Sequence, residues 1–556
     1  MKIIKELKDK YEIKDIETAF IVSYVSTNGI AVKNNLLIKS IIENEREKTI
    51  EIRKIISRYF KEISLFDLVR VFELLIPEED KRTNGAFFTP RLITSFITSE
   101  TITSKDSKIC DPSCGCGAFL IEAANKIYLD FGESIINIIR NNLYGIDIAD
   151  YSIRRARILL TLLALEKNED VREINFNIQQ NDSLQADWNE LFPEVLQKGG
   201  FDVVIGNPPY VKFQDLPNNL RKRLYENWLT LRQGSYNLYF AFFEVGIKIL
   251  KDDGILGYIT PNNYFTSLAG IHLREVLAYN KYLYKVVDFN HIKVFDAQTY
   301  TCITLLNKTR KESFLYERID NLELLNYLYE LDYSTVFFSN LNNRKWRLLR
   351  ARDQENIGKI ENTGIRLGDL ADIRVGIASL KDSVYFVDGT TYEDSYYRKD
   401  YKGKAYFIEA EITKPIVKIS DFMSQEDLDH NERRIIFPYE KIKGKKEIIS
   451  KEQFQYKYPK CYEYLLAAKD ELATRDKGEV EYPAWYAYGR TQGLNFWGHK
   501  LLTPTFSAKP RFLYEKNPEV LFCNGYAVYL KGKKDLFSIK GWDLDLISKI
   551  LNSKTK

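Results

Sequence analysis

The chain is poor in histidine and cysteine, and it has no long apolar run. Its four histidines, His272, His291, His430 and His499, argue against metal binding or acid–base catalysis that depends on histidine. Six cysteines in 556 residues do not indicate a disulfide framework. Because no apolar run reaches about 18 residues, we expect no membrane span. The N-terminus lacks the apolar core of a signal peptide, so the sequence predicts a cytoplasmic protein.

The charge of the chain is nearly balanced. Lys and Arg number 81 and Asp and Glu 77, which leaves a formal net charge of +4. This balance predicts no particular partner, so a nucleic-acid-binding surface would have to come from local basic clusters. Cys110, Cys114 and Cys116 lie close together, but the last two sit in a glycine-rich turn without a following His or paired CxxC. We therefore expect no metal site.

Four regions differ in their residue pattern. Residues 1–80 alternate apolar and charged residues at helical spacing and predict an N-terminal helical region. In residues 81–310, short apolar strands alternate with helical stretches, which is typical of a doubly wound, mostly parallel α/β sheet. Residues 311–350 are interpreted as a helical connector. Residues 351–556 combine short strands, turns and aromatic residues, and predict a mixed α+β domain.

Seven strands are expected in the sheet. They cover residues 108–110, 143–146, 176–178, 203–205, 255–259, 285–288 and 301–306. The segment between the last two is too short for a crossover helix, so these two strands should pair antiparallel.

Residues suited to a nucleoside ligand follow the first three strands. The segment from Asp111 to Leu120 contains Gly115 and Gly117, which allow the backbone to approach a ligand closely. Asp147 ends the second strand, where a carboxylate typically binds ribose hydroxyls. Asp182 follows the third strand and can accept a hydrogen bond from an adenine amino group. These residues fit NAD as well as S-adenosylmethionine, and each Asp would also suit a helix cap or a turn.

A second motif, Asn207-Pro208-Pro209-Tyr210, follows the apolar strand at 201–206. The Asn207 amide oxygen and the Pro208 carbonyl can each accept a hydrogen bond from an exocyclic amino group. The two prolines bring no competing N–H donor. Tyr210 offers a flat face on which a base can stack. The motif therefore predicts a site that holds a planar amine while a methyl group is transferred to it.

Upstream, Phe88-Thr89-Pro90 precedes a predicted helix. Thr89 suits the N-cap position and Pro90 the first helical position, and this capping role explains the motif by itself. A functional interpretation adds contacts with the methionine end of a cofactor.

With its motifs in this order, the chain resembles a γ-class DNA adenine-N6 methyltransferase of type II restriction–modification systems. The resemblance covers about residues 81–310, and residues 351–556 correspond in layout to a target-recognition domain. It implies a seven-stranded methyltransferase sheet, S-adenosyl-L-methionine as the cofactor, and methylation of an adenine flipped out of double-stranded DNA. The expected biological role is protection of host DNA.

The resemblance also implies individual roles for the site residues. Asp111 would bind the methionine ammonium group, Asp147 the ribose and Asp182 the cofactor adenine, while Ile148 would pack on the adenine face. Phe295 matches an aromatic residue that lies opposite the motif tyrosine, so that the target base would stack between Phe295 and Tyr210. A place in the core of a hairpin would also account for Phe295.

Several clusters in residues 351–556 are candidates for DNA contact. Lys and Arg suit phosphates, Arg suits guanine and Gln suits adenine in the major groove. Any one of these runs would also suit a solvated face. The candidates are Arg433-Arg434, residues 441–446, residues 485–492 and Lys509-Pro510-Arg511.

Other functions remain open. A bifunctional restriction–methylation enzyme needs nuclease residues, for which Glu79-Asp80-Lys81 is a candidate, but the helical pattern before it leaves little space for a nuclease sheet. Methyltransferases of RNA or of protein glutamine share the Asn-Pro-Pro-Tyr motif but seldom have such a long C-terminal region. A non-catalytic DNA-binding scaffold is disfavoured by the intact acidic strand ends. We expect a monomer, with any cognate restriction endonuclease acting as a separate protein.

Overall fold

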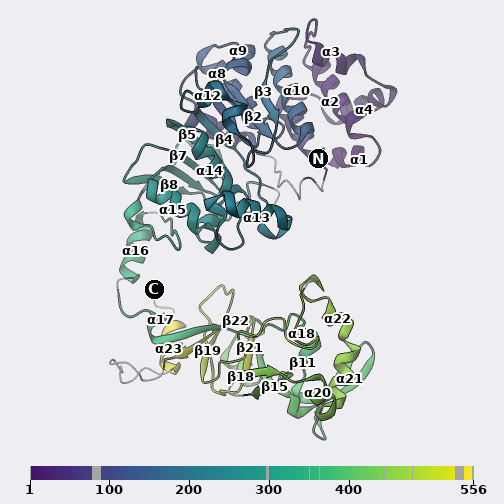
Figure 1. Cartoon of the computed structure of the whole chain (residues 1–556), viewed down its shortest axis with the longest axis vertical. Helices are drawn as coiled ribbons and strands as arrows, with labels where there is room; N and C mark the ends of the chain where they lie inside the picture. The colour runs from purple at the N-terminus through teal and green to yellow at the C-terminus, as the bar shows by residue number, and fades with distance from the viewer. Residues whose placement is uncertain are drawn as a thin grey trace. The chain divides into compact units, whose positions relative to one another are not determined.

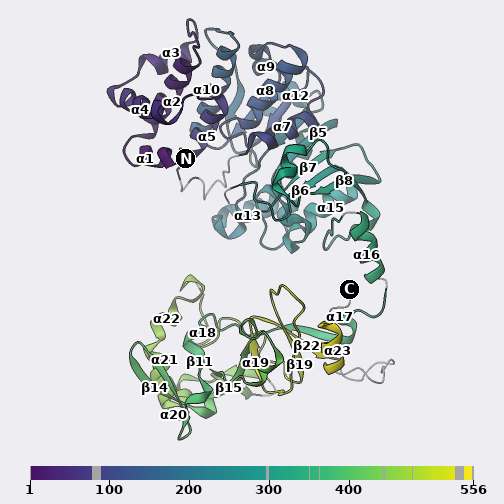
Figure 2. The same ribbon diagram turned by 180° about the vertical axis from the view of Figure 1, so that it is seen from behind.

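The computed structural model describes residues 2–77, 80, 89–295, 300–349, 351–361, 363–442, 445–478, 480–531 and 544–553. The chain divides into two compact units, Met1–Ile360 and Glu361–Lys556 (Figures 1 and 2). Within the described ranges, no helix is long and apolar enough to cross a membrane.

A nine-stranded sheet forms the centre of the first unit, in the order β3-β2-β1-β4-β5-β7-β6-β8-β9. Neighbours from β3 to β5 are parallel, whereas β7 is antiparallel to both β5 and β6. The predicted α/β fold with a mostly parallel sheet is confirmed, and so is the antiparallel pairing of its last two predicted strands. The strands are β1 (Ile109–Asp111), β2 (Leu143–Asp147), β3 (Asn177–Gln180), β4 (Phe201–Gly206), β5 (Leu250–Pro261), β6 (Leu283–Asp288), β7 (Thr301–Asn307), β8 (Ser313–Arg318) and β9 (Ser334–Phe337).

The segment 311–350 is not the helical connector that the sequence suggested. Strand β8 pairs parallel with β6, and β9 pairs antiparallel with β8, so this segment extends the sheet from seven strands to nine. In β8, Phe314 and Tyr316 are buried while Leu315 between them is exposed. This period of two is the pattern of a strand with one buried face. Helix α16 (Ala351–Glu361) follows only afterwards.

Helices cover both faces of the sheet. Val203 and Ile205 of β4 lie in one hydrophobic core, whereas Val204 between them lies in the other. Alternate residues of a buried parallel strand face opposite layers, which explains its continuous apolar sequence. The covering helices are α7 (Arg91–Thr101), α8 (Ala118–Phe131), α9 (Ile135–Asn141), α10 (Asp150–Glu166), α14 (Tyr239–Ile249) and α15 (Ile271–Asn280), whereas α13 (Asn218–Asn227) is mostly exposed.

The N-terminal helices share a hydrophobic core with the sheet domain. Ile16 and Phe20 of α2 and Phe72 of α5 are completely buried in the core that also contains Leu159 of α10. Helices α3 and α5 contact α10, and Figure 2 shows α2, α3 and α5 beside it. The N-terminal helices are α1 (Lys2–Lys8), α2 (Ile13–Thr27), α3 (Leu36–Glu43), α4 (Glu47–Tyr59) and α5 (Leu65–Leu74).

The second unit mixes small sheets with short helices. Two four-stranded sheets have the orders β10-β22-β19-β20 and β11-β16-β15-β21, beside the three-stranded sheet β12-β13-β14 and the β17–β18 hairpin. The strands of the two larger sheets are β10 (Ala371–Val375), β11 (Phe386–Val387), β15 (Thr413–Lys418), β16 (Arg434–Ile436), β19 (Lys500–Pro504), β20 (Leu513–Glu515), β21 (Leu521–Cys523) and β22 (Gly525–Leu530). The other strands are β12 (Tyr392–Glu393), β13 (Tyr396–Tyr401), β14 (Lys404–Glu409), β17 (Tyr439–Ile442) and β18 (Lys445–Ile448). The longer helices are α20 (Lys451–Lys457), α21 (Pro459–Ala467) and α23 (Leu544–Leu551).

Candidate active site

The glycine-rich turn and the Asn-Pro-Pro-Tyr motif meet at one edge of the sheet. Strand β1 lies between β2 and β4, so Asp111, Asp147 and Asn207 follow or end three neighbouring parallel strands. Gly206, the residue before Asn207, packs against the Asp111 carboxylate. A β-carbon at Gly206 would come within 2.7 Å of Asp111 Oδ1, so only glycine permits this approach. The two motifs are therefore adjoining parts of one site.

The glycine-rich turn is held on one side and open on the other. Gly115, with φ +52°, donates its backbone N–H to Asp147 Oδ2 over 3.0 Å. Gly117, with φ +87°, packs against Ala156 of α10. A β-carbon at Gly115 would meet no atom within 4 Å. The turn thus has open space beside a backbone conformation that favours glycine.

Two buried carboxylates flank this turn. Asp111 is 1% exposed and accepts the Ser113 backbone N–H over 3.0 Å. Burial, which the Ser113 N–H opposes and the charge of Asp147 reinforces, raises the pKa of Asp111 to about 8. Burial also raises the pKa of Asp147, although the N–H groups of Ala149 and Gly115 oppose this. Burial thus disfavours the charged form of both groups, so the pair fits a ligand that brings a cationic group and hydroxyls.

The loop after β3 joins the same edge. Asp182 accepts the backbone N–H of Leu184 over 2.9 Å and is half-buried. The Ser183 hydroxyl donates to the Pro112 carbonyl over 2.5 Å and so ties this loop to the glycine-rich turn. Sequence reasoning missed Ser183, and its place directly after Asp182 is the only signal for it. Ile148 is 55% exposed beside Asp147, so its side chain is accessible for an apolar contact.

Thr89 lies against the Asn-Pro-Pro-Tyr motif. Its buried hydroxyl accepts a hydrogen bond from Asn207 Nδ2 over 3.1 Å. The predicted capping is wrong by one residue, because α7 begins at Arg91 with Pro90 at the N-cap, and Thr89 precedes the cap. Thr89 is thus turned to the site instead of capping the helix. Phe88, predicted beside it, lies outside the described residues.

Tyr210 and Phe295 contact each other directly. Their ring centroids are 6.2 Å apart at an interplanar angle of 79°, which is an edge-to-face pair. A base can stack between them only if the two rings separate. The Tyr210 hydroxyl donates to the Ile259 carbonyl over 3.2 Å, and burial raises the pKa of this hydroxyl well above its usual range. Tyr239, which packs edge-on against Tyr210, had no sequence signal.

In the second unit, several residues predicted to contact DNA instead interact with other residues of the chain. Tyr486 and Tyr488 are buried in the core, and the Tyr488 hydroxyl donates to the Ile436 carbonyl over 2.5 Å. The prediction that this aromatic run meets DNA is wrong, because its rings form the centre of the unit. Arg490 forms an ion pair with Asp476 over 2.8 Å, while Gln492 is exposed.

The basic side chains predicted to contact DNA differ in whether they already pair with other residues of the chain. Arg433 forms an ion pair with Asp421 over 2.7 Å, and Arg434 bonds the Thr413 hydroxyl over 2.7 Å. Lys441 and Lys445 are exposed on the β17–β18 hairpin, and Lys509 is exposed between β19 and β20. Exposed lysines of this kind are the better candidates for phosphate contact.

Comparison with known proteins agrees with these motifs. Residues 141–295 match the Eco57I restriction-modification methylase family. The type II restriction enzyme and methyltransferase RM.Eco57I of Escherichia coli is 28% identical over 508 residues, which cover 78% of this chain and 50% of that protein. The type II methyltransferase M.BstVI of Geobacillus stearothermophilus is 24% identical, with 63% and 66% covered. The chain thus spans about half to two thirds of the length of these relatives.

Solved structures share the fold. The type IIL restriction-modification enzyme MmeI in complex with DNA superimposes with a TM-score of 0.58 at 12% identity, covering 99% of this chain and 78% of that chain. The DrdV–DNA complex has a TM-score of 0.52 at 13% identity, with 92% and 58% covered. The comparisons confirm that this chain resembles the methyltransferases of type II restriction–modification systems, as the order of its motifs predicted.

Proposed function

We propose that this chain transfers a methyl group from S-adenosyl-L-methionine to N6 of an adenine in double-stranded DNA. The contact between Gly206 and Asp111 is the main support for this proposal. It brings the amide that would hold the amine next to the carboxylate that would hold the cationic end of the cofactor. The resemblance to restriction–modification methyltransferases makes DNA the substrate that fits best.

The residues at the sheet edge fit this cofactor. Asp111 would bind its ammonium group, because a buried carboxylate with a raised pKa gains most from a cationic partner. Asp147 would accept from the ribose hydroxyls and Asp182 from the adenine amino group, with Ile148 on the adenine face. Phe88, Thr89 and Pro90 would lie toward the methionine end. When bound, S-adenosylmethionine supplies an activated methyl group.

Asn207 and Pro208 would orient the amine that receives the methyl group. Because Asn207 Nδ2 donates to Thr89, the other end of the amide is the one that accepts from the amine. The Pro208 carbonyl would accept the second N6 hydrogen. Held in this way, the nitrogen lone pair would be drawn out of conjugation with the ring and would face the methyl donor. Positioning supplies much of the rate, and the proton can leave to water after transfer.

Pro209, Tyr210 and Phe295 would complete the base pocket. Extruding a base costs a few kcal/mol. Stacking on an aromatic ring recovers on the order of 1–3 kcal/mol per base. Tyr210 and Phe295 would therefore exchange their contact with each other for contacts with the base.

We assign target recognition to residues 351–556 and catalysis to residues 81–310, with residues 1–80 as a helical region. The two solved relatives were determined in complex with DNA, which supports double-stranded DNA as the partner. We further propose a cytoplasmic monomer that protects host DNA, with any cognate nuclease as a separate protein.

The test is to supply radiolabelled S-adenosylmethionine with unmethylated duplex DNA, RNA or a protein mixture. We expect label only in DNA, and nucleoside analysis should identify the labelled product as N6-methyl-2′-deoxyadenosine. Label in RNA or glutamine, or on another base, would contradict the proposal. Asn207→Ala is the matched inactive control.

A bifunctional restriction–methylation enzyme is the second candidate. RM.Eco57I is named as both a restriction enzyme and a methyltransferase, and this chain matches half of it. Of the three candidate nuclease residues, Asp80 accepts a hydrogen bond from Tyr151, while Glu79 and Lys81 lie outside the described residues. Cleavage of unmethylated duplex DNA by the purified chain with magnesium would favour this function.

A further inference from the structure

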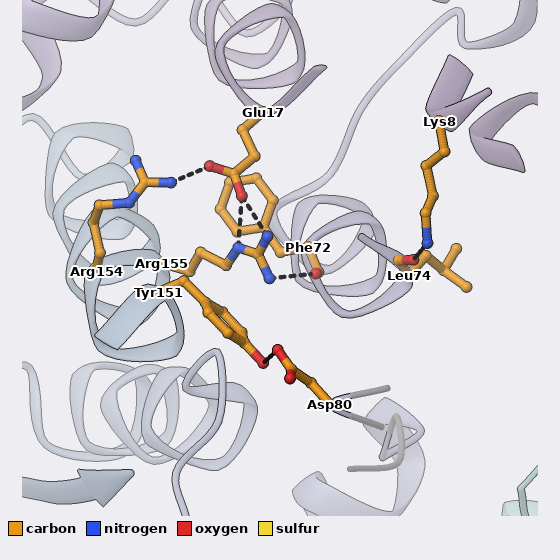
Figure 3. A network of polar contacts seen from close by, with 8 residues as sticks. All are labelled: Lys8, Glu17, Phe72, Leu74, Asp80, Tyr151, Arg154 and Arg155. Atoms are coloured by element: carbon orange, nitrogen blue, oxygen red, sulfur yellow. Dashed lines mark hydrogen bonds and ion pairs between the residues drawn. The ribbon is translucent and has the colours of Figure 1, made fainter. Parts of the chain in front are cut away.

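The first two turns of α10 connect the candidate cofactor site with the N-terminal helices. The helix begins three residues after Asp147, and Ser152 in its first turn hydrogen-bonds the Asp147 carboxylate. Arg154 and Arg155 of the next turn extend toward Glu17 of α2, as Figure 3 shows. One short stretch of helix therefore contacts both regions.

Arg155 is the centre of this network. Its Nε donates to Glu17 Oε1 over 2.7 Å, and its Nη1 donates to the Phe72 carbonyl of α5 over 3.0 Å. Arg154 forms a second ion pair with Glu17 (Figure 3). Glu17 and Arg155 are almost fully buried. Because water cannot replace a partner at this depth, loss of Glu17 would remove the carboxylate that pairs directly with a buried positive charge.

The same guanidinium lies beside the glycine-rich turn. Burial and the charge of Glu73 raise the pKa of the Cys116 thiol, while the charge of Arg155 and a hydrogen bond from it oppose this rise. The next residue, Ala156, supports Gly117, since a β-carbon there would come within 3.2 Å of Ala156 Cβ. Arg155 and Ala156 thus both contact residues of the glycine-rich turn.

Tyr151 provides a second connection. Its hydroxyl donates to Asp80 Oδ2 over 3.0 Å, and the Arg155 guanidinium lies 4.9 Å from its ring centroid (Figure 3). Asp80 precedes Thr89 by nine residues. The contact therefore restrains the chain shortly before it reaches the candidate site.

We propose that Glu17, acting through Arg155, is a positioning residue for the binding of S-adenosylmethionine. This inference rests on the proposed function. Without Glu17, the Arg155 guanidinium would be drawn toward Glu73, the carboxylate that acts most strongly on Cys116. This shift would break the hydrogen bond from Arg155 to Cys116 and displace the turn. Loss of Glu17 would therefore lower the affinity for the cofactor and leave the hydrogen bond between Asn207 and Thr89 in place.

The test compares Glu17→Gln with Tyr24→Phe in the whole 556-residue chain. The Tyr24 hydroxyl donates to Glu166 Oε2 over 2.6 Å. Glu166 is the last residue of α10, about 16 Å along the helix axis from Arg155. Both variants remove a contact between α2 and α10, but only the Glu17 contact adjoins the glycine-rich turn. Tyr24→Phe therefore serves as the control for losing an α2–α10 contact away from that turn.

By calorimetry, we expect the Kd for S-adenosylmethionine to rise roughly tenfold in Glu17→Gln and to stay within about twofold in Tyr24→Phe. In kinetics, Glu17→Gln should raise KM for S-adenosylmethionine and leave kcat within about twofold. A purely structural defect would instead lower kcat, by reducing the folded fraction, at constant KM. An unchanged Kd in Glu17→Gln, or an equal rise in both variants, would overturn the inference.

If Glu17→Gln does not fold, Glu17→Asp takes its place, because it keeps the buried negative charge and only withdraws the carboxylate from Arg155. We expect its Kd for S-adenosylmethionine to rise about threefold. A wild-type Kd in this variant would overturn the inference. Failure of the wild-type chain to bind S-adenosylmethionine would refute the proposed function itself, and the two failures are thus distinguishable.

Discussion

The side-chain amide of Asn207 donates a hydrogen bond to the hydroxyl of Thr89 over 3.1 Å, across 118 residues of sequence. This contact joins the segment before α7 to the motif after β4. It decides which end of the amide faces the sheet edge where a substrate amine would lie. The function proposed for Asn207 therefore depends on Thr89 as well.

Replacing Asn207 by Ala should abolish methylation while cofactor binding survives. The substitution removes an oxygen that would hold the amine during transfer, and loss of one such group typically costs about 10²–10³ in kcat. We expect the Kd for S-adenosylmethionine to remain within about threefold, because Asp111 and Asp147 keep their places. Single-turnover methylation and calorimetry measure the two effects separately. Wild-type turnover in this variant would exclude the role assigned to Asn207.

Thr89→Val should lower kcat about tenfold, because the isosteric methyl group no longer accepts from the Asn207 amide. The amide can then rotate and present its NH2 group to the substrate amine. Thr89→Ser, which keeps the hydroxyl, is the matched control and should retain most activity. Equal rates in the Val and Ser variants would show that the orientation of Asn207 is set by something else.

At Tyr210, substitution by Ala should reduce activity much more than substitution by Phe. Ala removes the ring on which the base would stack, a loss on the order of 1–3 kcal/mol. Phe keeps the ring but loses the hydrogen bond to the Ile259 carbonyl, so a small loss of about 1 kcal/mol is expected. The kcat/KM for a duplex substrate reports both. Losses of the same size would count against stacking.

The pH dependence of stability should change in Asp111→Asn. The folded pKa of about 8 lies above the ordinary value of 3.8, so the folded chain holds a proton that the unfolded chain has released. The stabilising contribution of this protonation is full below about pH 4 and is lost as pH rises toward 8. Asn cannot titrate, so the variant should lose less stability over this interval, by a few kcal/mol.

Urea unfolding of the ligand-free chain at several pH values between 4 and 9 provides the measurement for Asp111. The carboxylate of Asp147 titrates in both proteins, so the difference between their profiles reports Asp111 together with its charge interaction with Asp147. Parallel profiles for wild type and Asp111→Asn would show that the Asp111 carboxyl is not held protonated by burial.

Local sequence was sufficient to place a candidate site residue wherever that residue ends a strand or directly follows one. Asp111, Asp147 and Asn207 were placed correctly at one sheet edge, because parallel strands bring their carboxyl ends together. Strands β8 and β9 were missed because their own sequence does not show that β6 leaves an edge with which β8 can pair. The run at residues 485–488 was misinterpreted because tyrosine suits both a buried core and a nucleic-acid surface.

The sequence by itself determined the fold class, the order of the motifs and the kind of chemistry that those residues permit. Only the tertiary structure decided that Thr89 contacts Asn207, that Tyr210 packs against Phe295, and that Glu17 and Arg155 form a buried ion pair. The physical reason is that periodicity and turn chemistry act over a few residues. Partners in buried contacts are selected by how distant segments pack, which no local pattern records.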